Sequence, residues 1–198
     1  MRKVLTVLAL VLVPGLAMAA TPSEGVPLQV RRGFFTETDV GVFFTAGGGN
    51  NAYSNAQTYL QLGLGYDVNE NFELGFNFGM GTNAANCWSW DANKGVCTTT
   101  DNFTMTFLDV TASYLIRASD RFYVAPKLAG GWTLMDPAPT MDASGQPVKA
   151  GANVGGGVGF EYATHMDHFS IGADLLARVV VGPNIPTFTI FPRVKYTF

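Results

Sequence analysis

Residues 56–66 read AQTYLQLGLGY. Between Thr58 and Tyr66, every second residue is a leucine. Successive side chains of a β-strand point to opposite faces, so this stretch predicts a strand with one apolar face. Leu60, Leu62 and Leu64 lie on that face, and Gln and Gly residues lie on the other. The last stretch, residues 192–198, reads PRVKYTF and repeats the pattern up to the final residue.

The same period of two recurs along the chain. It marks eight segments, at about 36–45, 56–66, 72–81, 103–117, 122–134, 150–162, 169–181 and 187–198. A soluble β-sandwich would also alternate in this way, but eight strands are also the smallest common number for a transmembrane barrel. We therefore predict an all-β fold, an eight-stranded antiparallel transmembrane β-barrel of the outer-membrane type, over residues 36–198.

The N-terminus has the pattern of a secretory signal peptide. Met1, Arg2 and Lys3 form a basic start, residues 4–13 are apolar, and Ala19 and Ala20 follow. The apolar run is too short to serve comfortably as a membrane anchor. We predict a signal peptide over residues 1–20, cleaved after Ala19 or Ala20, and an irregular N-terminal lead-in over residues 21–35.

Charge and composition favour a barrel and argue against nucleic-acid binding. Removal of Arg2 and Lys3 from the twelve basic residues leaves ten against fifteen acidic residues, a net charge of −5. A nucleic-acid-binding domain needs a basic face. Only 14% of the residues are charged, whereas a soluble domain has about 25%.

The connections between the segments alternate in length. Residues 67–71, 118–121 and 163–168 are short, residues 46–55, 82–102 and 135–149 are long, and residues 182–186 are a short exception. Outer-membrane barrels have short periplasmic turns and longer outer loops. The alternation predicts both termini on the periplasmic side, in the outer membrane of a Gram-negative bacterium, with the lipid bilayer as the first partner of the wall.

Aromatic residues flank the short connections, as the interfacial girdles of barrels do. They are Tyr66, Phe72, Tyr114, Phe122, Tyr162, Phe169, Tyr196 and Phe198. The chain ends on Tyr196, Thr197 and Phe198, which resemble the terminal signal by which such barrels are recognised for insertion. We predict that Tyr196 and Phe198 are the assembly signal.

Cys87 and Cys97 are the two cysteines of the chain. In an exported protein such a pair predicts a local disulfide, which would hold the tip of an outer loop. Two free thiols or half of a metal site are the alternatives, but no His lies nearby to complete a zinc set.

The polar face of the segments predicts the content of the lumen. It is rich in Gly, Asn, Gln, Thr and Ser, and it also carries Glu73, Asp109, Lys127 and Glu161. In a barrel of this size side chains alone fill the interior, and buried charges must pair. We expect hydrated and ionic groups to plug the lumen, with a network of ion pairs formed by Glu37, Asp39, Asp174, Arg178, Arg193 and Lys195. A narrow ion path is the alternative.

Few residues could support catalysis. His165 and His168 both fall in a short connection, where they could bind a metal only loosely. No His lies in a long loop, and the chain has no Gly-x-Ser-x-Gly motif. We expect no catalytic, cofactor-binding or metal-binding residues and no enzymatic activity.

Two stretches resemble a specific family. Residues 31–45, RRGFFTETDVGVFFT, and residues 59–67, YLQLGLGYD, are similar to the outer-membrane barrel proteins of myxobacterial adventurous gliding motility. The resemblance implies a non-enzymatic part of a trans-envelope gliding and focal-adhesion complex. Its partners would be other barrels, lipoproteins and periplasmic proteins. A small pore, a lipid-modifying barrel and a passive wall-stabilising barrel remain as alternatives.

Overall fold

The structure is a computed structural model of the chain. It describes residues 33–45, 56–82, 86–91, 96–101, 104–136, 138, 142, 144–166 and 168–198. For residues 56, 57, 82, 86–91 and 96–101 it describes the backbone alone. The expected signal peptide and most of the expected lead-in lie outside the described residues, so both stay predictions.

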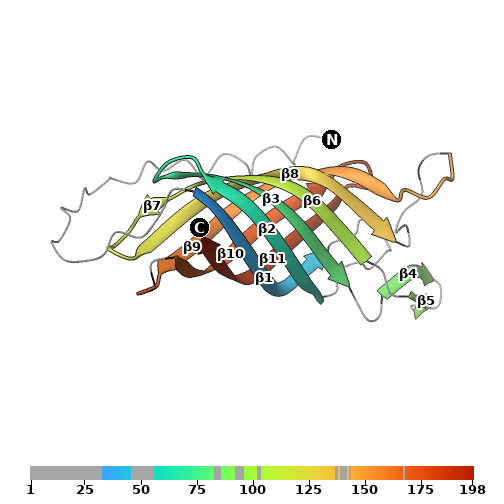
Figure 1. The fold of residues 1–198 in the computed structure, drawn as a ribbon. Coiled ribbons are helices and arrows are strands. Elements are labelled where there is room, and N and C mark those ends of the chain that lie inside the picture. Colours follow the sequence, from blue (N-terminus) through green and yellow to red (C-terminus); the bar gives the residue numbers. More distant parts are fainter. Residues whose placement is uncertain are drawn as a thin grey trace, which may run out of the picture.

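Long antiparallel strands make up the wall (Figure 1). They are β1 (Gly33–Thr45), β2 (Ala56–Asp67), β3 (Phe72–Thr82), β6 (Thr104–Tyr114) with its short continuation β7 (Ile116–Arg117), β8 (Phe122–Asp136), β9 (Ala150–Ala163), β10 (Phe169–Val180) and β11 (Ile185–Thr197). With β6 and β7 counted as one interrupted strand, the wall has eight strands, as the alternating pattern predicts.

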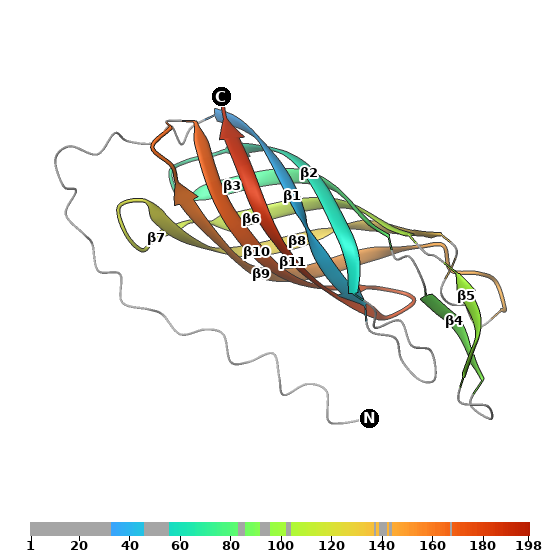
Figure 2. The same ribbon diagram turned by 90° about the horizontal axis from the view of Figure 1, so that it is seen from below.

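The sheet closes on itself. Its strand order is β6-β3-β2-β1-β11-β10-β9-β8, and a further pairing of β6 with β8 joins the two ends. The first and last strands lie side by side, with Phe35 opposite Thr197 and Thr45 opposite Thr187 (Figure 2). Closure pairs the two edge strands, which would otherwise present unpaired backbone groups. The fold is therefore an eight-stranded antiparallel barrel.

Several boundaries differ from the expected ones. β1 begins at Gly33, so residues 33–35 belong to the wall and not to the lead-in. Asp67, expected in a turn, is the last residue of β2 and is buried. At Leu115 the fourth wall strand is interrupted, and the Leu115 amide donates to the Asn71 carbonyl across the turn (2.7 Å).

The two ends of the barrel differ. One end, here called the turn end, carries residues 68–71, 118–121, 164–166 and 168 together with Phe198, and the opposite end, the loop end, carries residues 144–149 and 181–184. Val181–Asn184 is a tight connection at the loop end, where Gly182 has φ 100° and Asn184 has φ 54°. Glycine and asparagine tolerate this left-handed region better than other residues.

A small hairpin stands in the longest connection. β4 (Asn86–Asp91) pairs with β5 (Val96–Asp101) in a separate two-stranded sheet that projects beyond the loop end (Figures 1 and 2). The sequence predicts only a long connection here. The register sets Cys87 opposite Thr100 and Cys97 opposite Trp90. The side chains of both cysteines lie outside the described part of the chain, so their disulfide stays a prediction.

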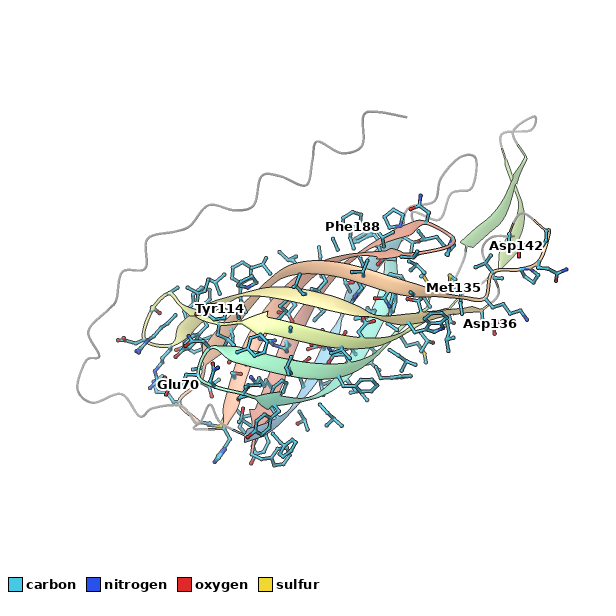
Figure 3. The ribbon with its side chains drawn as sticks, turned by 90° about the horizontal axis from the view of Figure 1, so that it is seen from above. Glu70, Tyr114, Met135, Asp136, Asp142 and Phe188 are labelled. Carbon is cyan, nitrogen blue, oxygen red and sulfur yellow. The ribbon has the colours of Figure 1, made fainter. Side chains whose placement is uncertain are left out.

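The outside of the wall is apolar. Leu60, Leu62 and Leu64 are exposed on β2, and Phe76 and Phe78 are exposed on β3. Figure 3 shows Tyr114 towards the turn end and Phe188 towards the loop end, with Asp142 beyond it. Within the described residues, no helix is long and apolar enough to cross a membrane.

Candidate functional site

The lumen is the part of the barrel where polar and charged side chains converge. Alternation along each strand turns one face inward, and every wall strand contributes at least one buried ionisable residue to it. Small residues on the inner face make room for large ones. A Cβ atom at Gly63, for example, would overlap both Glu37 and Asn77.

A first group, the basal cluster, lies near the turn end and consists of Phe35, Asp67, Glu73 and Lys195. The Lys195 ammonium donates to Asp67 Oδ1 (3.1 Å) and to Glu73 Oε1, and it lies 4.0 Å from the centre of the Phe35 ring. All four residues are buried. Lys195 on β11 thereby connects to β2 and β3, which are not adjacent to it in the sheet.

A second group, the central cluster, gathers around Arg193 and consists of Glu37, Asp39, Lys127, Glu161, Asp174 and Arg193. The Arg193 guanidinium lies 3.0 Å from Glu161 Oε2, 3.4 Å from Asp174 Oδ2 and 3.6 Å from Glu37 Oε2. The Lys127 ammonium donates to the same Asp174 oxygen (2.6 Å). Hydrogen bonds between charged groups, as in this cluster, are stronger than hydrogen bonds between neutral groups.

Asp39 belongs to the same cluster and lies on β1, the strand next to that of Arg193. It stands opposite Arg193 in the β1–β11 ladder, and its Oδ2 accepts a hydrogen bond from the Gln61 amide (2.6 Å). Gln61 Oε1 in turn accepts from the Tyr59 hydroxyl (2.8 Å). A chain of hydrogen bonds therefore runs from the central cluster towards the loop end.

Arg178 is the centre of a third group. Its Nε lies 3.1 Å from Asp109 Oδ2, and its Nη1 donates to the Thr189 hydroxyl (3.1 Å). The Asn153 amide donates to Asp109 Oδ1 (2.8 Å) and to the Thr133 hydroxyl (3.0 Å). These contacts connect β10 with β6, across the lumen.

The six residues predicted for the network thus fall into three groups rather than one. Arg193 contacts both Glu37 and Asp174, and Asp39 stands opposite Arg193 on the neighbouring strand. Arg178 pairs with Asp109, and Lys195 pairs with Asp67 and Glu73. The sequence shows which residues face inward, but the partner of a long side chain depends on strand tilt and stagger, which the pattern does not specify.

Between Arg178 and the loop end, the lumen is filled by apolar side chains instead of charged ones. An apolar cluster fills its loop end, formed by Phe43, Tyr59, Met105, Phe107, Met135, Leu176, Val180, Ile185 and Phe191. The Tyr59 ring centre lies 5.6 Å from Phe191, 5.8 Å from Phe43 and 6.1 Å from Phe107. The expectation that hydrated and ionic groups fill the whole lumen is therefore wrong at this end.

A signal for this cluster is present in the sequence. At most strand positions of the cluster, two neighbouring residues are both apolar, as at Phe43-Phe44, Leu134-Met135 and Ile190-Phe191, whereas Met105 lies between Thr104 and Thr106. One member of each pair faces the bilayer and the other faces the lumen. A strict alternation of polar and apolar residues does not predict the inward member, because it expects a polar residue at that position.

The end of the chain lies in an aromatic group at the turn end. The Tyr196 ring packs against Phe169 (4.8 Å between centres) and Phe198 (5.1 Å), and the Phe198 amide donates to the Phe34 carbonyl (2.8 Å). These contacts place Tyr196 and Phe198 in the girdle on the outer wall. Their part in assembly stays a prediction.

The two histidines do not share a site with a charged cluster among the described residues. His168 Nδ1 lies 2.7 Å from the Thr197 carbonyl oxygen, and its ring lies 5.6 Å from Tyr196. His165 is exposed in the turn. Within the described part of the chain, no three carboxylate, imidazole or thiol groups are arranged to hold a metal ion.

The fold resembles known small barrels, although the sequence does not. No protein family and no curated protein matches the sequence. Among the solved structures that share the fold, three small barrels each align with most of this chain. Neisserial surface protein A has a TM-score of 0.59 and 13% identity over 83% of this chain and 97% of its own. Ail of Yersinia pestis has a TM-score of 0.53 and 14% identity, and the alignment covers 84% of this chain and 99% of Ail. The N-terminal β-barrel domain of Pseudomonas aeruginosa OprF has a TM-score of 0.52 and 12% identity, and the alignment covers 83% of this chain and 97% of that domain.

The similarity to these solved structures and the apolar outer wall together indicate where in the cell the protein is located. A closed barrel satisfies every backbone group within its own ladder, which a bilayer demands. The exposed leucine and phenylalanine side chains of the wall suit hydrocarbon. The protein is an outer-membrane β-barrel that sits in the lipid bilayer.

Proposed function

We propose that this protein is a non-enzymatic outer-membrane barrel that acts as an interaction or structural component of the cell envelope. The observation that carries the proposal is the filled lumen. Ion pairs occupy its turn half, and packed rings occupy its loop end. A closed interior leaves the loops, the turns and the outer wall as the surfaces on which the protein can act.

The loop end offers the most developed surface of this kind. The β4–β5 hairpin projects beyond the barrel. In another connection, the Asp142 amide donates to the Gln146 carbonyl and the Gly145 amide donates to the Asp142 carbonyl, as in a compact turn. The Asp142 carboxylate accepts hydrogen bonds from the Ser144 amide, the Ser144 hydroxyl and the Gln146 amide (2.6–2.9 Å). Ordered loops on a rigid scaffold are where proteins commonly place binding residues.

The particular assembly is suggested only by sequence resemblance. Residues 31–45 and 59–67 are similar to barrels of myxobacterial gliding motility, and this similarity supports a place in a gliding and focal-adhesion complex with other barrels, lipoproteins or periplasmic proteins. The three solved structures of similar fold do not support this finer assignment.

Site-specific photocrosslinking in living cells tests the proposal. A photoreactive amino acid is introduced at Gln146 in the loop end, at Glu70 in the turn end, or at Leu128 on the lipid-facing wall as the matched control. Discrete protein adducts are expected from Gln146 or Glu70, with envelope proteins identified by mass spectrometry. Deletion of the gene is expected to impair surface movement and to leave permeability unchanged.

The opposite result would favour another class. Steady conductance of the purified wild-type barrel in planar bilayers, without adducts at Gln146 or Glu70, would make it a pore. A changed lipid A mass upon deletion would make it a lipid-modifying enzyme. Either result would overturn the proposed role.

The assembly signal has a separate test. Replacement of Phe198 by serine removes a ring that packs on Tyr196, so we propose that Phe198→Ser lowers the amount of barrel in the outer membrane. Immunoblots of outer-membrane fractions measure this. Phe188→Ser, a matched change on the wall far from the C-terminus, is the control, and equal levels of all three proteins would exclude the signal.

A further inference from the structure

The ladder of the wall is interrupted at two of the eight seams between neighbouring strands. Between β1 and β11 the register omits residues 40–41 and 191–192. Between β8 and the β6–β7 strand it omits residues 114–115 and 125–126. At the other six seams the register of the described strands runs without a gap.

A proline lies at each interruption. Pro192 keeps its place opposite Ala173 in the β10–β11 ladder, so the side of Pro192 that lacks a donor faces β1. In the same way, Pro126 stands opposite Val158 in the β8–β9 ladder and lacks a donor towards β6. Because proline has no N–H group, each position loses a ladder hydrogen bond.

The two interruptions are closed in different ways. At the β1–β11 seam the backbones stay in contact, because a Cβ atom at Gly41 would overlap the Ile190 carbonyl oxygen. At the β6–β8 seam, both backbone groups of Leu115 bond to Asn71, which precedes β3. The Leu115 amide donates to the Asn71 carbonyl (2.7 Å), and the Asn71 side-chain amide donates to the Leu115 carbonyl (2.9 Å). Neither interruption is bridged by ladder hydrogen bonds.

The two seams lie on opposite sides of the barrel. The strand order places β1, β2, β3 and β6, here called the N-terminal half, between them on one side. It places β8, β9, β10 and β11, the C-terminal half, on the other side. Three uninterrupted ladders join the strands within each half. The wall therefore consists of two continuous four-stranded sheets.

The charged side chains of the lumen are divided between these halves. Among the described residues, every buried lysine or arginine belongs to the C-terminal half, whereas the buried charged residues of the N-terminal half are all acidic. The ion pairs Arg178–Asp109, Arg193–Glu37, Lys195–Asp67 and Lys195–Glu73 cross from one half to the other. The Lys127–Asp174 pair, in contrast, lies within the C-terminal half. Ion pairs across the lumen thus hold the two sheets together.

We propose that the two halves hinge at the β6–β8 seam and that the wall opens towards the bilayer at the β1–β11 seam. Hinges are commonly a few residues at the ends of structural elements, and Leu115, between β6 and β7, has such a position. The ion pairs across the lumen keep the barrel closed. The proposal goes beyond the role in envelope interactions, which needs only a closed barrel.

Distances between pairs of spin labels, measured by electron paramagnetic resonance in lipid vesicles, test this proposal. The full-length mature protein is used, with both native cysteines replaced by serine. Labels at Leu62 on β2 and Ile171 on β10 lie on either side of the β1–β11 seam. Labels at Val194 on β11 and Phe122 on β8 are separated by the same number of strands within one half. All four positions are exposed on the outer wall. The distance distribution across the seam is expected to be about twice as wide as the one within the half.

A proline variant identifies the cause of the opening. Pro192→Val returns the missing donor to the β1–β11 ladder and is expected to narrow the distribution across the seam to the width found within one half. Pro186→Val is the matched control, because Pro186 lies on the same strand beyond the last pair of that ladder, Thr45 with Thr187. It is expected to leave the width unchanged. Circular dichroism and gel mobility confirm that the variants fold.

A second pair of variants tests the ion pairs. Arg178→Met removes the contact with Asp109 across the lumen and is expected to widen the distribution across the seam further. Lys127→Met removes a pair within one half, and Asp174 keeps its contact with Arg193. This control is expected to leave the width unchanged.

Three results would overturn the proposal. They are equal widths for the two label pairs, an unchanged width across the seam after Pro192→Val, and equal effects of Arg178→Met and Lys127→Met. The comparison of the two label pairs needs no change inside the barrel, so it remains decisive where a variant fails to fold. None of these results bears on the crosslinking test of the proposed function.

Discussion

The two halves of the lumen are filled by opposite chemistry. Towards the turn end, Arg193 and Lys195 join carboxylates from several strands, whereas at the loop end Phe43, Tyr59 and Phe191 pack as in the core of a soluble protein. The same strands line both halves with the same inward alternation. The position of a residue in a wall strand therefore determines whether its side chain points into the lumen, but it does not determine whether that side chain is polar or apolar.

The two halves differ in how they tolerate damage. An ionic cluster has its charges already desolvated, so loss of one member leaves the others uncompensated. An apolar cluster loses only contact area and gains a cavity. Substitutions in the two halves should therefore differ in their cost to stability.

Replacement of Arg193 by methionine is expected to have the largest effect. It leaves Glu37, Glu161 and Asp174 buried without their shared cation, and we expect a loss of about 4 kcal/mol in the free energy of unfolding. Guanidinium unfolding in lipid vesicles, followed by fluorescence, measures the loss. Arg117→Met, which breaks the exposed pair with Asp120, is the control and should cost about 0.5 kcal/mol. Equal losses would show that the ionic half is not stabilised by its charges.

Phe191→Ala is expected to be less severe. The ring stacks on Tyr59 and is fully buried, so its removal should cost about 3 kcal/mol through lost contacts and a cavity. The same unfolding measurement applies. Phe188→Ala, on the lipid-facing side of the same strand, serves as the control and should change stability little. A smaller loss for Phe191→Ala than for Phe188→Ala would contradict the idea of a packed inner cluster.

Gly81→Ala tests whether the apolar half is as tightly packed as a protein core. A Cβ atom at Gly81 would overlap the Phe43 ring, and we expect a cost of about 2 kcal/mol from the forced shift. At Gly130 the nearest atom to an added Cβ is 3.6 Å away. Gly130→Ala should therefore cost little in the same assay. If the two variants unfold alike, the cluster has room to spare.

Asp142 provides the smallest expected effect and a reference carboxylate outside the lumen. Hydrogen bonds from the Ser144 hydroxyl and the Gln146 amide hold the pKa of Asp142 below its ordinary value of 3.8. Because the folded pKa is lowered, the turn keeps this stabilisation above the ordinary pKa and loses it as the pH falls through the lowered one. Carboxyl and amide chemical shifts in an NMR pH titration should report a common midpoint below 3.8. Ser144→Ala should raise that midpoint, and an unchanged midpoint would contradict the hydrogen-bond assignment.

The wall could be predicted well from the sequence. A period of two over residues 56–66 and its seven repeats specify strands, and each boundary lies within a few residues of the observed one. The pattern is informative because each wall strand has one face in hydrocarbon. A charged or polar side chain on that face destabilises the barrel, so the outward positions are apolar along the strand. The β4–β5 hairpin projects beyond the barrel and is not part of its wall, so this constraint does not act on it and the sequence does not predict it.

The candidate site could be predicted only in part. Glu37, Asp174 and Arg193 were placed together from their strands, and the structure brings them into contact. Asp67 was assigned to a turn, yet it is a partner of Lys195. The difference arises because β2 extends one residue further than expected, and a single residue decides whether a side chain faces the lumen.

Strands that alternate between an apolar outer face and an inward face follow from the amino-acid pattern alone. Which inward residues meet is visible only in the folded barrel, where aromatic rings fill one end of the lumen and Arg193 and Lys195 pair with carboxylates in the rest. Side-chain direction follows from local backbone geometry, whereas contacts across a closed barrel depend on how all eight strands are tilted and staggered together.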